Sequence, residues 1–372
     1  MKEGWEYKKL GEVCEIIGGG TPDKKNKEYY DGNIPWATVR DMNVEWLGHT
    51  EYSITDKGLE KSASNIIPRG EVIIATRVGL GKVCLLKQDT AINQDLKGIV
   101  PKDDTNRRFL FYWFKFESKN IISNGVGATV KGVRISYIHD LLFPNITLSE
   151  QHRIVSYLDA AFAKIDAVAK NAEDALNEAK ALFQSALTKM MEPKEGWEEK
   201  HLDEVAENCD SKRIPVKLGK RKGGEYPYYG ASGIVDYVED YIFDGDFLLI
   251  SEDGANLLAR VTPIAFSVTG KFWVNNHAHI LKFNDVITQQ FVEFYFKSIN
   301  IKEYVTGAAQ PKLTQRNLNK IPIYIPSLKE QQSVVCELQK LENITQQLQS
   351  NLTLTLSECA ALKQSILRQT FE

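Results

Sequence analysis

The sequence predicts an α+β protein in which two α/β globular halves are joined by two long antiparallel coiled-coil helices, with pseudo-twofold symmetry. Three observations predict this fold. The chain of 372 residues repeats itself, each half mixes strand and helix patterns, and each half is followed by a long run without glycine or proline. The expected globular domains are residues 1–146 and 193–326, and the expected helical segments are residues 147–192 and 327–372.

Internal repetition is the strongest of these signals. Between Lys2–Val13 and Lys194–Val205, nine of twelve positions are identical, at an offset of 192. A second match, of Leu148-x-Glu150-Gln151 with Leu328-x-Glu330-Gln331, has an offset of 180. We therefore expect a tandem duplication in which each globular half precedes a long helix.

Each globular half shows short apolar runs between turn residues. Residues 71–76 and 82–86, separated by Gly79-Leu80-Gly81, predict a hairpin. Aromatic residues at helical spacing predict a helix packed on the core within residues 105–118. In the second half, residues 247–251 and 264–268 predict strands, and residues 288–298 predict the equivalent helix.

The two long helices each begin with a capping box, Thr147-x-x-Glu150 or Ser327-x-x-Glu330. Their apolar residues recur in steps of four and three, the coiled-coil period. The predicted seams include Ile165, Val168 and Leu182 in the first helix and Leu338, Cys359 and Leu362 in the second. The favoured partner of each helix is the other one, antiparallel; the alternative is pairing between two copies of the chain.

Composition excludes several classes of protein. With 46 basic and 49 acidic residues and 43% hydrophobic residues, the chain is not collagen-like, wholly disordered or a disulfide scaffold. It has no apolar stretch long enough for a membrane span and no apolar segment at its start, so we expect a cytoplasmic protein. Five scattered cysteines without a CxxC pair predict free thiols.

Catalytic motifs are not evident, which predicts a binding protein rather than an enzyme. The run Gly18-Gly19-Gly20-Thr21-Pro22 lacks the lysine of a phosphate-binding loop. Glu198-Glu199-Lys200 has the form of a nuclease motif, but we interpret it as a solvated helix face. His277-x-His279 has the spacing of metal ligands on a strand, but no third or fourth ligand is evident, so we expect structural histidines and no metal.

Two similar but divergent globular halves suit a bipartite duplex DNA target. Basic residues that would neutralise phosphates, rather than only form a solvated surface, are Lys24, Lys25, Lys27, Lys131, Lys212, Arg213, Lys220, Arg221, Lys222 and Lys312. Polar residues that would read bases from strand ends and loops are Arg40, Asn43, Thr76, Arg77, Asn93, Gln94, Tyr229, Ser232, Glu252, Asp253 and His277.

The ordered motifs resemble the specificity (S) subunit of type I restriction–modification enzymes over essentially the whole chain. The residues that carry the resemblance are Gly19-Gly20-Thr21-Pro22, Tyr29-Tyr30-Asp31-Gly32-Asn33-Ile34-Pro35-Trp36, Ile67-Pro68-Arg69-Gly70, Arg77-Val78-Gly79, Asn93-Gln94, Tyr226-Pro227-Tyr228-Tyr229-Gly230-Ala231-Ser232-Gly233 and the two Leu-x-Glu-Gln helix starts.

This resemblance implies two target-recognition domains, each reading one half of an asymmetric bipartite DNA site, and spacer helices that set the number of unread base pairs. It also implies docking of two DNA-adenine methyltransferase subunits, for which we predict contacts at Glu150, Gln151, Glu330 and Gln331. Restriction subunits would join to form the nuclease. S-adenosylmethionine, ATP and magnesium would belong to those partners, with no cofactor and no catalysis in this chain. The alternatives are a coiled-coil scaffold that binds only proteins and a cryptic nuclease.

Overall fold

The computed structural model describes residues 2–127, 131–307 and 309–372. The chain divides into two compact units: unit 1 comprises residues 1–171 and 354–372, and unit 2 comprises residues 172–353. Both divisions fall inside a long helix, either α5 (Leu148–Met190) or α10 (Leu328–Phe371). Each unit therefore contains one globular half together with part of both helices.

Unit 1 contains two sheets and a two-stranded ribbon. The larger sheet has five strands, in the order β2 (Cys14–Gly18), β10 (Leu96–Pro101), β7 (Val72–Ala75), β8 (Val83–Leu86) and β4 (Trp46–Leu47). The smaller sheet has four, in the order β5 (Tyr52–Ile54), β3 (Tyr30–Ala37), β9 (Thr90–Ile92) and β6 (Asn65–Ile67). The ribbon pairs β1 (Tyr7–Lys9) with β11 (Leu142–Pro144).

Unit 2 repeats this topology. One four-stranded sheet has the order β13 (Ala206–Asn208), β20 (Ala278–Phe283), β17 (Phe247–Ser251) and β18 (Ala265–Val268). The other has the order β15 (Gly233–Val238), β14 (Gly223–Gly230), β19 (Lys271–Val274) and β16 (Phe243–Asp244). The ribbon pairs β12 (Glu198–Lys200) with β21 (Ile323–Ile325). The matching strand orders show that the chain is a duplication.

Helices complete each unit. Unit 1 contains α1 (Leu10–Val13), α2 (Asp56–Glu60), α3 (Arg107–Ser123) and α4 (Ile135–Asp140), with 3-10 turns at Lys27–Tyr29 and Val39–Asp41. Unit 2 contains α6 (Leu202–Val205), α7 (Asn256–Ala259), α8 (Val286–Ser298) and α9 (Gln315–Leu318), with 3-10 turns at Asp210–Lys212, Leu218–Lys220 and Lys302–Tyr304.

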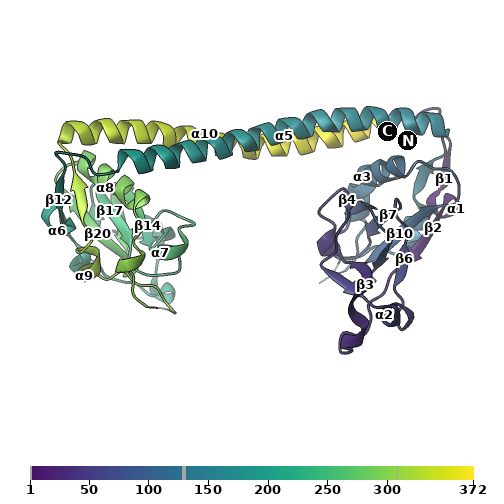
Figure 1. The fold of residues 1–372 in the computed structure, drawn as a ribbon, viewed down its shortest axis with the longest axis horizontal. Helices are drawn as coiled ribbons and strands as arrows, with labels where there is room; N and C mark the ends of the chain where they lie inside the picture. Colours follow the sequence, from purple (N-terminus) through teal and green to yellow (C-terminus); the bar gives the residue numbers. More distant parts are fainter. Residues whose placement is uncertain (1, 128–130, 308) are drawn as a thin grey trace. The chain divides into compact units, whose positions relative to one another are not determined.

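The predicted local elements are confirmed. Strands β7 and β8 form the expected hairpin, in which Gly79 (φ 75°) and Gly81 (φ 84°) adopt left-handed backbone conformations that favour glycine. The aromatic stripe lies on α3, where Phe109, Tyr112 and Trp113 are buried. In Figure 1, α3 lies between α5 and the sheet that contains β7 and β10, and α8 has the corresponding place above β17 and β20.

The long helices are capped as predicted: the Glu150 N–H donates to Thr147 Oγ1 (3.3 Å) and the Glu330 N–H donates to Ser327 Oγ (3.4 Å). Within unit 1 the end of α10 runs antiparallel beside the start of α5, since Cys359 Sγ contacts the Ile165 carbonyl (3.7 Å) and Lys363 pairs with Asp166. Within unit 2, Leu187 of α5 shares a core with Val334 and Leu338 of α10.

Parts of the predicted seam are wrong. Val168, Leu182 and Leu362 are 54%, 59% and 51% exposed, although we expected them at the helix contact. A straight α-helix has 3.6 residues per turn, so a strict 3.5-residue repeat drifts by about 20° per heptad. The buried face of α5 therefore moves to later residues, including Leu176 and Leu187.

All five cysteines are free. Within the residues that the structure describes, the helices lack the length and apolar character needed to cross a membrane.

Candidate nucleic-acid interface

In both units the candidate site lies where a buried strand ends beside the other sheet. In unit 1, β7 leads into Thr76, and residues 93–95 connect β9 to β10. The Thr76 N–H donates a hydrogen bond to the Asp95 carbonyl (2.9 Å). In unit 2 the Glu252 N–H donates to the His277 carbonyl, also at 2.9 Å. The two strand ends are therefore equivalent positions of the duplicated fold.

A cavity of about 580 Å³ lies beside the strand end of unit 1. Four predicted DNA-binding residues line it: Lys24, Arg40, Asn93 and Gln94. Our sequence reasoning missed its other lining residues, which include Tyr30, Trp36, Tyr52 and Asp95. The aromatic stretch from Tyr29 to Trp36 was a signal for the site, but we used it only as a mark of resemblance. Cationic and polar groups around one cavity are suited to contacts with both phosphates and bases.

Asp95 organises the polar side chains of this strand end. Its Oδ2 accepts hydrogen bonds from Asn93 Nδ2 (3.3 Å) and Gln94 Nε2 (3.2 Å). Arg77 Nη1 lies 3.8 Å from its Oδ1, and the Thr21 hydroxyl donates to Gln94. Arg77 and Gln94 are exposed, whereas Thr76 and Asn93 are buried. Arg77 and Gln94 are thus accessible to a ligand, and the other two support the turn.

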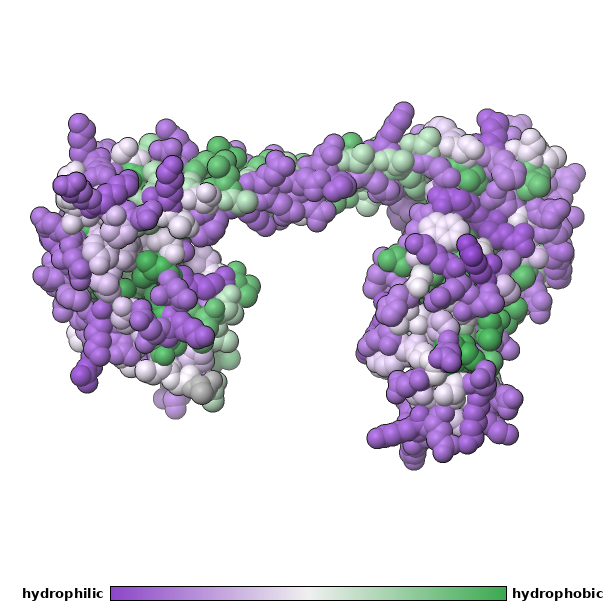
Figure 2. Space-filling model, viewed as in Figure 1, coloured by the Kyte–Doolittle hydropathy of each residue, from purple (hydrophilic) through white to green (hydrophobic). Residues whose placement is uncertain are grey.

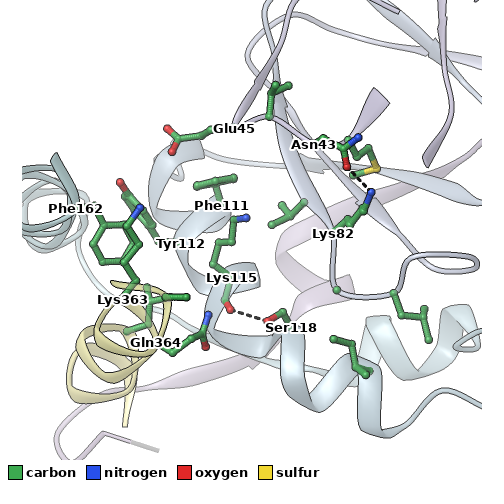
Figure 3. A pocket seen from close by; sticks show the side chains of 18 residues that line it. Asn43, Glu45, Lys82, Phe111, Tyr112, Lys115, Ser118, Phe162, Lys363 and Gln364 are labelled. Carbon is green, nitrogen blue, oxygen red and sulfur yellow. Dashed lines mark hydrogen bonds between the residues drawn. The ribbon is translucent and has the colours of Figure 1, made fainter. Parts of the chain in front are cut away.

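The structure places Asn43 away from this cavity. Its Oδ1 accepts a hydrogen bond from Lys82 Nζ (2.7 Å), and its Nδ2 donates to the Arg40 carbonyl (2.8 Å). It lines a second cavity of unit 1, of about 540 Å³, together with Tyr112 and Lys115 (Figure 3). Burial in that cavity lowers the pKa of Lys115.

Exposed basic side chains surround the strand end of unit 1. Lys24, Lys25 and Lys27 are all exposed, in the loop before β3. Arg40 is also exposed, with its Nη1 3.7 Å from Glu51 Oε2. Lys131 is exposed beside Gly132, which forms a β-bridge with Arg77. These groups have the position and charge for phosphate contacts.

The strand end of unit 2 carries a buried ion cluster. Arg213 Nη1 donates to Glu252 Oε2 (2.6 Å), and its Nη2 lies 3.5 Å from Asp210 Oδ2. Lys312 Nζ lies 3.2 Å from Glu252 Oε1. Burial alone would raise the pKa of Glu252, but the hydrogen bond from Arg213 and the nearby positive charges hold it below its ordinary value. Arg213, predicted to contact DNA, is thus held inside its own unit by two carboxylates.

The two histidines of this region have separate partners. His277 Nδ1 lies 2.8 Å from Asp253 Oδ2. His279 is buried, with Nδ1 2.6 Å from Asp210 Oδ2 and Nε2 2.8 Å from the Leu313 carbonyl. Burial would raise the pKa of Asp210, but the hydrogen bond from His279 outweighs it and lowers that pKa.

Asp210, Glu252 and His279 have the donor types of a metal site, with ligand atoms within 4.8 Å of one another. The guanidinium of Arg213 already supplies positive charge to both carboxylates, and both ring nitrogens of His279 are hydrogen-bonded. The donor set therefore fits an internal salt-bridge network, and His277 lies outside it.

The remaining basic residues predicted in unit 2 differ in accessibility. Lys212 and Lys222 are exposed and pair with Glu207 and Glu239, each at 2.8 Å, and Lys220 is exposed. Arg221 is held more tightly: its Nη1 lies 3.2 Å from Asp236 Oδ2 and its guanidinium lies 4.4 Å from the Tyr228 ring centroid.

Tyr229 and Ser232 lie near the turn that joins β14 to β15. The Tyr229 ring is half-buried, 5.7 Å from the Phe272 centroid, and burial raises its pKa. Ser232 is exposed in the turn itself. Of the two, Ser232 is the more accessible to a ligand.

The side chains predicted to contact partners have contacts inside their own units. Gln151 is buried: its Oε1 accepts from the Asn106 N–H (2.8 Å) and its Nε2 donates to the Ile146 carbonyl (3.0 Å). Gln331 is buried and donates to the Pro326 carbonyl (2.8 Å). Glu150 pairs with Arg153, and Glu330 Oε1 accepts from Trp197 Nε1 (3.2 Å). The two glutamines therefore anchor the helix starts, and their contact with a partner stays a prediction.

Our interpretation of Glu198-Glu199-Lys200 as a helix face is wrong. These residues form β12, which pairs with β21. Neighbouring side chains of a strand point to opposite faces, so Glu199 points away from Glu198 and Lys200. Glu199 instead bonds to Tyr324 and raises the pKa of that phenol. The convergence that a nuclease motif requires is not formed by these three side chains.

Known proteins resemble this chain along most of its length. A family model described as the type I restriction modification DNA specificity domain matches residues 2–178 and 194–356. The specificity subunit of the type I restriction enzyme MjaIX from Methanocaldococcus jannaschii is 24% identical over 362 residues, covering 87% of this chain and 83% of the relative. The EcoprrI specificity subunit from Escherichia coli is 24% identical over 375 residues, covering 95% and 92%.

Some relatives match over a shorter range. The EcoR124I/EcoR124II specificity subunit of Escherichia coli is 30% identical over 167 residues, so the match spans 43% of this chain and about two fifths (41%) of the relative.

Two solved structures share the fold. A chain in a structure of a type I R-M system has a TM-score of 0.78 at 19% identity and covers 100% of this chain and 98% of its own length. The HsdS subunit from Thermoanaerobacter tengcongensis has a TM-score of 0.58 at 19% identity, covering 100% and 97%.

Proposed function

Because this chain belongs to the type I restriction–modification DNA specificity family, we propose that its two units read the two halves of an asymmetric bipartite DNA site. The observation that carries this proposal is the duplicated strand end. The same backbone hydrogen bond places Thr76 of unit 1 and Glu252 of unit 2 at equivalent positions, but the side chains around them differ. Equivalent positions with different side chains are what two different half-sites require.

We place catalysis and cofactors on partner subunits rather than in this chain. S-adenosylmethionine, ATP and magnesium would be bound by methyltransferase and restriction subunits. The glycine run of unit 1 supports this assignment, because its glycines serve packing. A Cβ on Gly19 would lie 2.1 Å from the Asn93 carbonyl oxygen, and one on Gly20 would lie 2.4 Å from the Ala63 carbonyl carbon. These glycines let the chain approach the strand-end connection closely.

We further propose that two DNA-adenine methyltransferase subunits dock on the long helices, and that restriction subunits join the complex. Apolar side chains exposed on α5 and α10 support a protein-binding role. They are Tyr157, Val168, Leu182, Ile344, Leu354, Leu356 and Leu362. Figure 2 shows hydrophobic residues at the surface of both helices, while the globular parts are covered mainly by hydrophilic residues. A complex that acts on chromosomal DNA would work in the cytoplasm.

We also propose that α5 and α10 set the distance between the half-sites. Both helices extend without a break from one unit into the other, since the unit boundaries lie at residues 171/172 and 353/354. A continuous helix transmits position at about 1.5 Å per residue.

Reconstitution tests the proposed function. The full chain is mixed with its DNA-adenine methyltransferase partner, and methylated adenines are mapped on genomic DNA. We expect methylation at one bipartite sequence, and none by the chain alone. Methylation without sequence preference by the reconstituted complex would contradict the proposal. Magnesium-dependent cleavage of DNA by the chain alone would instead favour the nuclease alternative.

A further inference from the structure

Backbone contacts define which residues of the two strand ends correspond. The Val133 N–H donates to the Thr76 carbonyl (2.9 Å), and the Leu313 N–H donates to the Glu252 carbonyl (2.7 Å). One residue further, Arg77 forms a β-bridge with Gly132, and Asp253 forms one with Lys312. Arg77 therefore corresponds to Asp253, and Gly132 corresponds to Lys312.

The facing connection corresponds as well. The Asp95 N–H donates to Asn93 Oδ1 (3.1 Å), and the His277 N–H donates to Asn275 Oδ1 (2.7 Å). Each of these asparagines is bonded through its own N–H to the end of the neighbouring strand, at Ala37 (3.1 Å) or Tyr229 (3.0 Å). Asp95 therefore corresponds to His277.

The same two positions form an ion pair in each unit, with the charges exchanged. In unit 1 the strand end supplies the nitrogen group, Arg77, and the connection supplies the carboxylate, Asp95. In unit 2 the connection supplies the nitrogen group, His277, and the strand end supplies the carboxylate, Asp253. In both pairs the nitrogen group is exposed (55% and 45%) and the carboxylate is recessed (16% and 14%).

The neighbouring position is adapted to this exchange. A Cβ on Gly132 would lie 3.1 Å from Arg77 Cγ, so a larger residue there would press on the arginine side chain. In unit 2 the shorter Asp253 is paired with a long residue, Lys312, whose Nζ reaches Glu252 Oε1 at 3.2 Å. The two units therefore differ as connected sets of residues and not only at single positions.

The two exposed groups offer opposite hydrogen-bonding chemistry. The guanidinium of Arg77 has only donors and matches the O6 and N7 acceptors of guanine in the major groove. His277 Nδ1 faces a carboxylate, so it carries the proton, and Nε2 of the neutral ring is an acceptor. That acceptor matches the amino group of adenine N6 or cytosine N4.

We infer that Arg77 and His277 are the corresponding specificity-determining residues of the two units, and that Asp95 and Asp253 are the positioning residues that aim them. In this arrangement Arg77 reads a guanine in one half-site and His277 reads an adenine or cytosine in the other. The inference rests on the proposed function, because it assumes that each unit reads one half-site.

Methylation by the reconstituted complex tests this inference. In the variant Arg77→Ala we expect discrimination at one guanine of one half-site to fall by about 5- to 150-fold, with the other half-site unchanged. Arg77→Lys keeps the charge but loses the planar fork, so it should relax the same position. His277→Ala should relax an adenine or cytosine position in the other half-site only.

Further variants test the positioning role. Asp95→Asn and Gly132→Ala should weaken discrimination at the guanine that Arg77→Ala relaxes, and adding either change to Arg77→Ala should cause no further loss. Asp253→Asn should do the same at the position that His277 reads. Matched controls are Lys9→Ala and Lys200→Ala, which remove exposed lysines paired with Asp140 (2.8 Å) and Glu198 (2.9 Å) on the ribbons. They should leave both half-sites unchanged.

The outcomes separate this inference from the proposed function. If Arg77→Ala and Arg77→Lys lower methylation equally at all sites, or leave the recognised sequence intact, the inference is overturned while bipartite recognition stands. A His277→Ala complex with an unchanged second half-site would overturn it equally. If the unaltered complex shows no sequence preference, the proposed function itself fails.

Discussion

Replacing Phe371 with alanine should destabilise unit 1, because this ring closes the core from the far end of the sequence. Phe371 is buried and stacks on Phe116 (ring centroids 5.4 Å apart). Its centroid lies 5.5 Å from that of Phe109 and 6.3 Å from that of Trp5. Truncation of a buried phenylalanine costs about 3–5 kcal/mol. For a unit of this size, that cost corresponds to a fall in Tm of roughly 6–20 °C.

Differential scanning calorimetry of the full chain measures this effect, with the transition of unit 2 as an internal reference. The control is Leu362→Ala, on the same helix but 51% exposed, which should change stability by less than about 0.5 kcal/mol. Equal melting of the Phe371→Ala and Leu362→Ala proteins would refute the packing of α10 in the core of unit 1.

Three further predictions follow from the site. Arg213→Met leaves two buried carboxylates without their counter-ion and should destabilise unit 2 by about 3–5 kcal/mol, measured by urea unfolding; a change under about 1 kcal/mol would contradict the ion cluster. Asp210 and Glu252 have lowered pKa values, so the stability they contribute is present at neutral pH and is lost as pH falls below about 4. Acid titration of unfolding should show this loss in unit 2, and the double change Asp210→Asn and Glu252→Gln should remove it. Changing three exposed lysines to glutamine should weaken DNA binding at all sequences alike and reduce the salt dependence by about one ion per lost phosphate contact, without altering the recognised sequence; they are Lys24, Lys25 and Lys27.

Local patterns were sufficient for the fold because they are repeated in one chain. The glycine turn between β7 and β8, the aromatic stripe of α3 and the two helix caps each depend on residues close together in sequence. The seam of the long helices was predicted less well, because burial at Leu176 depends on the helix twist and on the facing helix, which periodicity alone does not include.

The candidate site was predicted only in part. Arg77 and Gln94 could be named from the sequence because they are polar residues at the end of an apolar strand or beside it. Asp95 was missed, since its role depends on three partners that only folding brings together. Likewise, Arg213 looked like a free basic residue, because the carboxylates that hold it lie on other segments, at Asp210 and Glu252.

The most direct test of the account is to lengthen both helices and map the DNA site again. Seven residues, two helical turns, would be inserted after Asn171 in α5 and after Thr353 in α10, where the units divide. The insertion adds about 10 Å along the helices and preserves the seven-residue repeat. We predict that the reconstituted complex methylates the same two half-sequences with a longer unread segment between them. Recognition of the same half-sequences at the original spacing would contradict the claim that paired helices set the distance between two reading units.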